Sequence, residues 1–311
     1  MVTRRIERVA FLGLGAMGRP MAETLLGAGF ALTVFDIRAE SRAALAARGA
    51  REATSAAAAV TDADACVIMV QTFAQVRAIM WGEGGAAGAL AALSPGALVL
   101  LMSSVAPADA RELDAACRER GVLLLDAPVS GGTGAAASGT LSIIVGGPDE
   151  TLARAVPLLD ALGDPARRWQ VGPNVGDGQS MKMINQLMAG INIAASCEAM
   201  VLAAKAGLDP QQAYEIIRVS AGGSWMFDNR VPRMLGRDFA PPQSALAIFV
   251  KDLGIVTDTA DDLGLPLFLA PLARQIFKYA AASGLAAEDD AGLIRFYEAA
   301  AGLHLGRADE G

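Results

Sequence analysis

The feature that most constrains this chain is a set of three glycines, Gly13, Gly15 and Gly18, directly after the apolar run 9–12. Glycines at these spacings permit a tight turn from a strand into a helix and close approach of the backbone to a pyrophosphate. The start of that helix adds free N–H groups and a partial positive charge. A second apolar run ends at Asp36, 18 residues after Gly18, where a carboxylate can accept hydrogen bonds from a ribose. The pattern predicts a dinucleotide-binding unit.

The acidic residue also indicates which dinucleotide is bound. A carboxylate at position 36 repels a 2′-phosphate, so we expect NAD, with NADP as the less favoured cofactor; Arg38 leaves some room for NADP. A glycine-rich surface turn is the alternative interpretation, but it does not account for Asp36. We therefore assign cofactor contacts in this region to Gly13, Leu14, Gly15, Ala16, Met17, Gly18, Asp36 and Ile37.

The first half of the chain alternates short apolar runs with alanine-rich helical stretches. This rhythm predicts a doubly wound, mostly parallel sheet with right-handed crossovers, which is a Rossmann fold. Segment 139–147 follows a strand with no helix expected in between, so the far edge of the sheet is expected to be antiparallel. The predicted strands are 8–12, 31–36, 66–71, 98–103, 123–126 and 141–145, and the predicted helices are 17–28, 73–80, 107–120 and 149–162.

From about residue 175 the apolar residues recur at helical spacing to the end of the chain. We therefore predict two domains, a Rossmann domain at 1–173 and an all-helical domain at 174–311. One long helix, 179–206, is expected to be shared by both, and the ligand site is expected between them at the carboxyl ends of the strands. Further helices are predicted at 210–220, 245–263, 266–283 and 290–302.

Composition excludes several classes of function. The net charge of −7 gives no basic surplus for nucleic acid or an anionic membrane. A single histidine, His304, argues against a metal site or a histidine-based triad. The most apolar stretch, 187–204, carries Glu198, so no membrane span is expected. The three scattered cysteines are predicted to be reduced core residues of a cytoplasmic protein.

Candidate functional groups follow the predicted strands. Val70 and Gln71 end one strand and Ser104 follows the next, where both segments can pack against the nicotinamide half of the cofactor. After strand 123–126, Gly131 and Gly132 free backbone N–H groups to converge on an anion, with the Ser130 hydroxyl beside them. A flexible surface turn is the alternative for this segment.

The long helix carries the candidate acid/base. Lys182, Asn185 and Gln186 are spaced to share one helix face among apolar neighbours. The lysine either extends its ammonium out of a buried helix or points into a cleft, where partial desolvation beside a cationic nicotinamide favours the neutral amine. Further on, Lys251 either reaches the cofactor or a substrate carboxylate, or forms a surface ion pair with Asp252.

Four motifs in this order resemble the β-hydroxyacid dehydrogenase family, which includes 3-hydroxyisobutyrate dehydrogenase and tartronate semialdehyde reductase. They are FLGLGAMGRPM at 11–21, DAPVSGG at 126–132 with GTL at 139–141, GQSMKMIN at 178–185, and KDL at 251–253. The resemblance implies that Lys182 is the catalytic acid/base and that Ser104 and Lys251 contact NAD. It also implies a small hydroxy-acid substrate and a homodimer or homotetramer. The implied substrate contacts are Ser130, Gly131, Gly132, Asn185 and Gln186.

The motif details are most similar to the L-threonate dehydrogenase branch of the family. The catalytic motif usually ends in two asparagines, but here the second is Gln186, and the stretches 187–190, 221–230 and 248–253 also resemble that branch. Gly223 stands where that branch has asparagine. The resemblance implies oxidation of L-threonate or a related aldonate. The alternatives are 3-hydroxyisobutyrate oxidation, tartronate semialdehyde reduction, and a non-catalytic dinucleotide-binding module.

Overall fold

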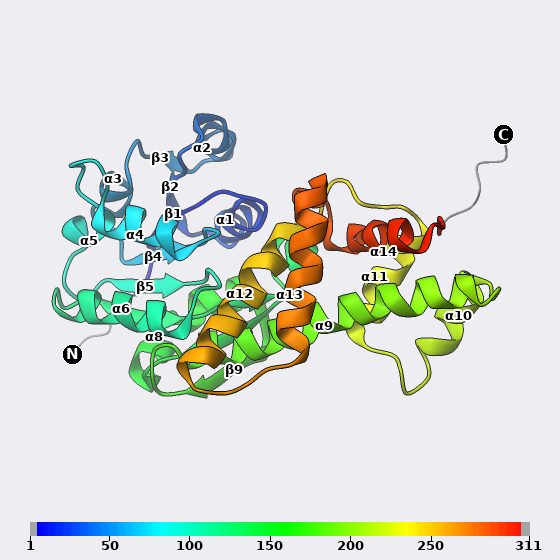
Figure 1. Cartoon of the computed structure of the whole chain (residues 1–311). Coiled ribbons are helices and arrows are strands. Elements are labelled where there is room, and N and C mark those ends of the chain that lie inside the picture. Colours follow the sequence, from blue (N-terminus) through cyan, green and yellow to red (C-terminus); the bar gives the residue numbers. More distant parts are fainter. Residues whose placement is uncertain (1–4, 306–311) are drawn as a thin grey trace. The chain divides into compact units, whose positions relative to one another are not determined.

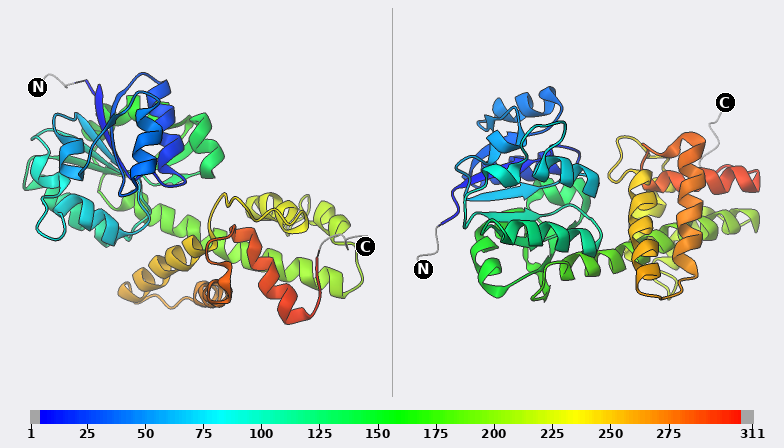
Figure 2. Two further views of the ribbon diagram at one scale, coloured as in Figure 1. Left: turned by 90° about the horizontal axis from the view of Figure 1, so that it is seen from above. Right: turned by 60° about the vertical axis from the view of Figure 1, so that its left-hand side comes forward.

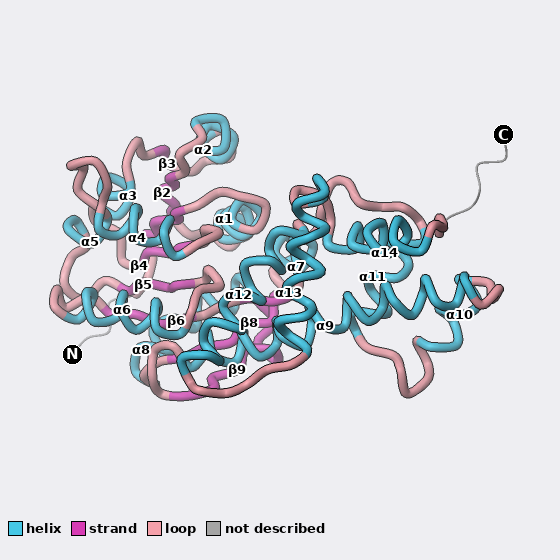
Figure 3. Tube along the Cα trace, in the orientation of Figure 1, coloured by secondary structure: helices cyan, strands magenta, loops and turns pink. Residues whose placement is uncertain are grey.

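The structure is a computed structural model, and it describes residues 5–305. The chain divides into two compact units, and the division lies between Lys182 and Met183 (Figure 1). Strands occur in the first unit, whereas the described part of the second unit is helical (Figure 3). This arrangement confirms the predicted fold class. The division predicted at 173/174 lies in the turn just before the long helix and stays a prediction.

The first unit is built on one sheet with the strand order β3-β2-β1-β4-β5-β6-β8-β7, in which β9 also pairs with β8. All pairs from β3 to β6 are parallel. Strands β4 and β5 are buried along their whole length, which is the pattern of parallel strands covered on both faces. The strands are β1 Arg8–Leu12, β2 Ala31–Phe35, β3 Arg51–Glu52, β4 Ala65–Ile68, β5 Leu98–Leu101, β6 Leu123–Asp126, β7 Val129–Ser130, β8 Leu141–Gly146 and β9 Gly163–Gly172.

Helices cover both faces of this sheet, as two views show (Figure 2). One apolar core includes buried residues of α1, α7 and α8, and a second core on the other face includes residues of α3 to α6. The helices are α1 Gly18–Gly27, α2 Ala39–Ala46, α3 Ala56–Val60, α4 Phe73–Trp81, α5 Ala89–Ala92, α6 Pro107–Arg118, α7 Gly132–Ser138 and α8 Asp149–Leu162.

The far edge of the sheet differs in part from the prediction. Strand β8 pairs antiparallel with β6 and β7, as expected. The expectation that no helix precedes β8 was wrong, because α7 lies between β7 and β8. Strand β9 was not predicted, since most of its side chains are exposed and several are charged. It pairs parallel with β8 through an irregular register.

The second unit packs around α9 (Asp177–Lys205), which begins in the first unit and continues without interruption. Among the helices of residues 5–305, α9 alone is long and apolar enough to cross a membrane, yet 44% of its most apolar window is buried inside the protein. Ile193, Cys197 and Met200 are fully buried in the core that α9 shares with its neighbours, so it is a core helix.

The other elements of this unit are α10 Pro210–Ile217, α11 Trp225–Leu235, α12 Leu246–Asp262, α13 Leu269–Ala280, a π-helical turn at Ala281–Leu285, a 3₁₀ turn at Asp290–Leu293, and α14 Ile294–Ala301. The helix predicted at 266–283 therefore begins three residues later and ends in a wider turn. The helix predicted at 290–302 opens as a 3₁₀ turn. Helix α11, which carries Pro232 in its interior, was not predicted.

Candidate active site

Glycine is required for different reasons at the three glycine positions of the first turn. Gly13 adopts φ 98°, and a side chain there would collide with the carbonyl oxygen of Met69. A side chain at Gly18 would collide with the carbonyl oxygen of Gly13. A Cβ at Gly15 would meet nothing within 4 Å. The fold itself therefore needs the outer glycines, while Gly15 borders open space that a ligand can approach.

Asp36 is joined to this turn. Its Oδ2 accepts the N–H of Leu14 at 2.7 Å, and its Oδ1 accepts the N–H and Nε–H of Arg38 at 2.9 and 3.2 Å. Burial raises the pKa of Asp36, but these N–H donors and the Arg38 guanidinium outweigh it, and the pKa lies below its ordinary value. The carboxylate is therefore ionised at neutral pH and fixed beside the glycine turn.

The segments that follow β4 and β5 are joined by a hydrogen bond. The Ser103 hydroxyl accepts the N–H of Val70 at 2.8 Å, which links the ends of the two strands. The N–H of Gln71 donates to the Gln75 side chain at 2.8 Å, within the capping box that begins α4. Strand 66–71 was predicted too long because β4 ends at Ile68 and the chain turns toward this cap. Ser104, which follows Ser103 in the loop after β5, is half-buried.

The predicted substrate loop is a junction between a strand and a helix. Ser130 pairs with Ser142 across β7 and β8. Gly131 and Gly132 have φ values of 130° and 70°, a region that disfavours other residues, and α7 begins at Gly132. The alternative of a flexible surface turn does not describe this segment. Its backbone is set by the sheet on one side and by α7 on the other.

The start of α9 is fastened to the end of β6 by Asp126. This fully buried carboxylate accepts the N–H of Gly176 through Oδ1 at 2.8 Å and the N–H of Gln179 through Oδ2 at 2.6 Å. It thereby satisfies N–H groups that a helix start leaves without partners. Burial raises the pKa of Asp126 to about 7, opposed by these two N–H donors, with the charge of Asp177 adding to the rise.

Gln179 links the same helix to the end of β5. Its Oε1 accepts the N–H of Val105 at 3.1 Å, and its Nε2 donates to the carbonyl of Ser103 at 2.9 Å. The side chain is 1% exposed. No role was predicted for Gln179 from the sequence, where it appears only as one letter of the motif at 178–185. No role was predicted for the carboxylate of Asp126 either, although an acidic residue at the end of a buried strand was the available signal.

Lys182 follows three residues after Gln179 on α9 and is buried, with 7% of its surface exposed. Asn185 and Gln186 follow on the same continuous helix, as their spacing predicted. Lys182 closes the first unit, and the other two residues belong to the second. The structure therefore places Lys182 on the helix whose start is fixed by Asp126 and Gln179.

In the second unit, Gln186 is the centre of a polar chain. It accepts the side-chain N–H of Asn185 at 3.1 Å and donates from Nε2 to Oδ2 of Asp252 at 2.6 Å. The other carboxylate oxygen of Asp252 pairs with Lys251 Nζ at 2.7 Å. Asp252 is buried while Lys251 is partly exposed, so the pair lies at the border of the core rather than on an open helix surface.

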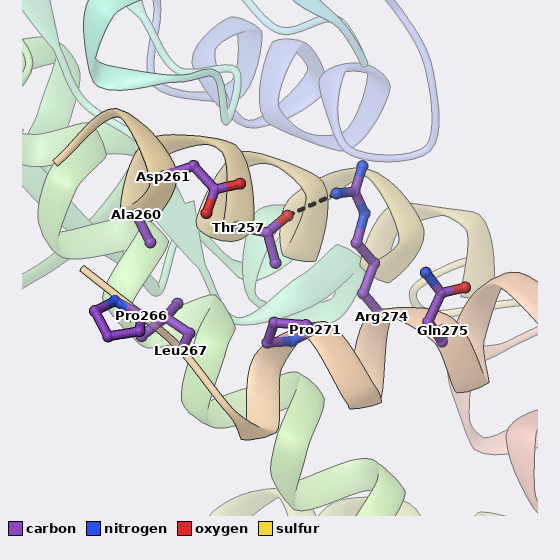
Figure 4. Close-up of a pocket in the computed structure, with 8 residues that line it drawn as sticks. All are labelled: Thr257, Ala260, Asp261, Pro266, Leu267, Pro271, Arg274 and Gln275. Carbon is purple, nitrogen blue, oxygen red and sulfur yellow. Dashed lines mark hydrogen bonds between the residues drawn. The ribbon is translucent and has the colours of Figure 1, made fainter. Parts of the chain in front are cut away.

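A separate pocket lies between α12 and α13 (Figure 4). Arg274 reaches across it and donates to the Thr257 hydroxyl at 2.6 Å. None of the residues that line it is among those predicted to contact cofactor or substrate. The pocket therefore shares no residue with the predicted site.

Comparison with known proteins shows which family the chain belongs to. Residues 8–175 match the family described as the NAD binding domain of 6-phosphogluconate dehydrogenase, and residues 176–297 match the NAD-binding domain of NADP-dependent 3-hydroxyisobutyrate dehydrogenase. The chain is 41% identical over 291 residues to L-threonate dehydrogenase of Cupriavidus necator, covering 94% of this chain and 96% of that protein. It is 38% identical over 291 residues to NAD-dependent L-serine dehydrogenase of Pseudomonas aeruginosa, covering 91% and 95%.

A crystal structure of 3-hydroxyisobutyrate dehydrogenase from Salmonella typhimurium has the same fold, with a TM-score of 0.83 at 39% identity, covering 93% of this chain and 99% of that one. Fold and matches together define an NAD(P)-dependent dehydrogenase that acts on the CH–OH group of a hydroxy acid. The chain belongs to the 3-hydroxyisobutyrate dehydrogenase-like family. The resemblance inferred from the four motifs is thereby confirmed.

Proposed function

We propose that this protein oxidises L-threonate or a closely related aldonate, with NAD as the hydride acceptor. The proposal depends on one observation above all: a buried lysine, Lys182, lies in the second turn of α9, three residues beyond Gln179, whose N–H is bound by Asp126. Lys182 would take the proton of the substrate hydroxyl during oxidation and return it during reduction, and NAD held at the glycine turn would supply the hydride acceptor.

The other predicted residues divide into substrate and cofactor groups. Ser130, Gly131 and Gly132 bind the substrate carboxylate through the hydroxyl and the backbone N–H groups at the start of α7. Asn185 orients the reacting hydroxyl. Gln186 holds Asn185 in place, because both ends of its amide are already engaged within the protein. The cofactor contacts are those of the glycine turn, Asp36, Ile37, Val70, Gln71, Ser104 and Lys251.

The choice of L-threonate is supported by the sequence identity to L-threonate dehydrogenases and by glutamine at position 186. The relative named as an L-serine dehydrogenase and the solved 3-hydroxyisobutyrate dehydrogenase have similar identity. Both of those substrates are three-carbon backbones with one small substituent, whereas L-threonate carries two further hydroxyl groups. Discrimination among them therefore depends on groups that hydrogen-bond these hydroxyls.

Initial rates of NAD reduction with a panel of acids test this proposal. We expect L-threonate to give a kcat/KM at least ~10-fold above L-serine and 3-hydroxyisobutyrate, because a site built to hydrogen-bond hydroxyls rejects substrates that lack them. D-threonate is the matched stereochemical control. A higher kcat/KM for 3-hydroxyisobutyrate would overturn the substrate assignment. NADH binding without turnover of any hydroxy acid would favour a non-catalytic role.

NAD preference is proposed to come from the Asp36 carboxylate. In Asp36→Asn the amide oxygen can still accept the N–H of Leu14, but the charge that repels a 2′-phosphate is lost. A charge pair at this range is worth about 1–4 kcal/mol, so the ratio of kcat/KM for NAD to that for NADP should fall by ~10- to 1000-fold. The control is Glu52→Gln, which removes the negative charge of the residue that pairs with Arg42. An unchanged ratio in Asp36→Asn would refute this origin.

We also propose a homodimer or homotetramer formed through the helical unit. Phe268, Leu272 and Tyr279 recur at helical spacing along one side of α13 and are each more than half exposed. A second copy of the chain would remove these apolar side chains from water. The three cysteines are free and buried, which supports a cytoplasmic location.

A further inference from the structure

Gln179 makes two hydrogen bonds on either side of Ser104. Its amide accepts from the N–H of Val105 and donates to the carbonyl of Ser103, as a neighbouring strand would. These two bonds fix which end of the amide is oxygen, since a reversed amide would oppose donor to donor and acceptor to acceptor. The backbone that presents Ser104 is therefore held by one buried side chain from α9.

The backbone of Gln179 is held in turn by Asp126. The carboxylate packs tightly between two glycines. A Cβ added at Gly146 would lie 2.5 Å from Oδ1, and a Cβ added at Gly178 would lie 2.8 Å from Oδ2. Asp126 is also the first residue of the segment that leads to Ser130. A single buried cluster therefore joins the ends of β5 and β6 to the first turn of α9.

The cluster lies within four residues of three predicted functional groups. Ser104 stands between Ser103 and Val105, Ser130 lies four residues after Asp126, and Lys182 lies three residues after Gln179. Three residues of α-helix advance about 4.5 Å along the axis, less than one turn. Lys182 therefore lies less than one helical turn from the residue that fixes this part of α9.

We propose that Gln179 is a positioning residue, anchored by Asp126, that keeps the Lys182 helix and the Ser104 backbone in the mutual arrangement that hydride and proton transfer require. The proposal rests on the proposed function, because the roles of Ser104 and Lys182 come from it. A misplacement of about 1 Å in such an arrangement costs ~100-fold in rate. Gln179 acts on turnover without touching substrate or cofactor.

Gln179→Met tests this proposal, because methionine has similar length and volume but makes neither hydrogen bond. We expect kcat per NADH-binding site to fall by ~10- to 100-fold, with NADH affinity changed by less than ~3-fold, since Ser104 is one of many proposed cofactor contacts and the glycine turn and Asp36 are untouched. Gln179→Glu, which can accept from Val105 but cannot donate to Ser103, should also lose turnover. Gln170→Met is the matched control: Gln170 bonds Gly147 and Asp149 in the same unit, and its loss should leave kcat unchanged.

Hydrogen–deuterium exchange gives a readout that does not depend on any substrate. The Val105 amide should exchange at least ~10-fold faster in Gln179→Met than in the wild type or Gln170→Met. Unchanged exchange at Val105 would overturn the proposal whatever the enzyme acts on. Faster exchange with unchanged kcat per binding site would also overturn it, as it would leave a structural role only. Failure of the wild type to oxidise any hydroxy acid would instead count against the proposed function.

Discussion

Replacing Lys182 by methionine should lower kcat by at least ~100-fold while leaving NADH affinity nearly intact. Methionine fills the buried volume of the lysine stem, so the helix packing is kept and the proton-transferring amine is removed. General acid–base catalysis contributes about 10²- to 10⁴-fold, which sets the size of the expected loss. The measurement is steady-state kcat on the best acid of the panel, together with NADH fluorescence titration.

Two further variants separate chemistry from structure. Lys182→Arg keeps the positive charge but cannot release its proton near neutral pH, so it should be as inactive as the methionine variant. Lys205→Met, at the exposed end of the same helix, should retain full turnover. Recovery of activity by arginine would mean that only the charge matters. Equal losses of turnover and NADH binding in Lys182→Met would mean that the lysine is structural.

Alanine at Gly15 and at Gly18 should have opposite effects on stability and cofactor binding. At Gly18 the added Cβ collides with the backbone of Gly13, so the free energy of unfolding should fall by about 1–3 kcal/mol. At Gly15 the Cβ meets nothing within 4 Å of protein, so stability should be unchanged or rise by up to ~1 kcal/mol. In Gly15→Ala the added methyl group should instead weaken binding of the dinucleotide and raise KM for NAD ~10- to 100-fold.

Thermal unfolding without cofactor and NAD kinetics of the two variants check this pair. Each glycine serves as the control for the other, because both substitutions add one methyl group to the same turn. A loss of stability in Gly15→Ala with no change in KM would place the pyrophosphate elsewhere. The same result would remove the physical basis for assigning cofactor contacts to the turn from residue 13 to residue 18.

The fold was largely predictable because the central parallel strands, such as β4 and β5, are continuous apolar runs, whereas the short edge strand β3 is not and was missed. Strand β5, which is buried throughout, has no competing interpretation. The missed elements lack such a signal. Helix α7 has seven residues including two glycines, β9 is mostly exposed, and α11 contains Pro232. Local periodicity cannot detect an element whose stability comes from its neighbours.

The sequence singled out candidate site residues only where one residue carries a recognisable chemistry. Asp36 and Lys182 stand out from their spacing and surroundings. The partners that orient them do not: Gln179 bonds groups 74 and 76 residues away in the chain, and Gln186 bonds Asp252 66 residues away. These pairings require the folded backbone, because a glutamine or a carboxylate on a helix has many possible local partners.

The polar chain from Asn185 through Gln186 and Asp252 to Lys251 has a consequence for how such enzymes diverge. A change at position 186 that suits a different acid also alters the hydrogen bonding of the carboxylate that balances Lys251. In the roles proposed above, Gln186 acts on the acid and Lys251 on the dinucleotide, so a substitution selected for one ligand would also shift the affinity for the other through this chain. Among paralogues, preferences for the two ligands should therefore drift together rather than independently.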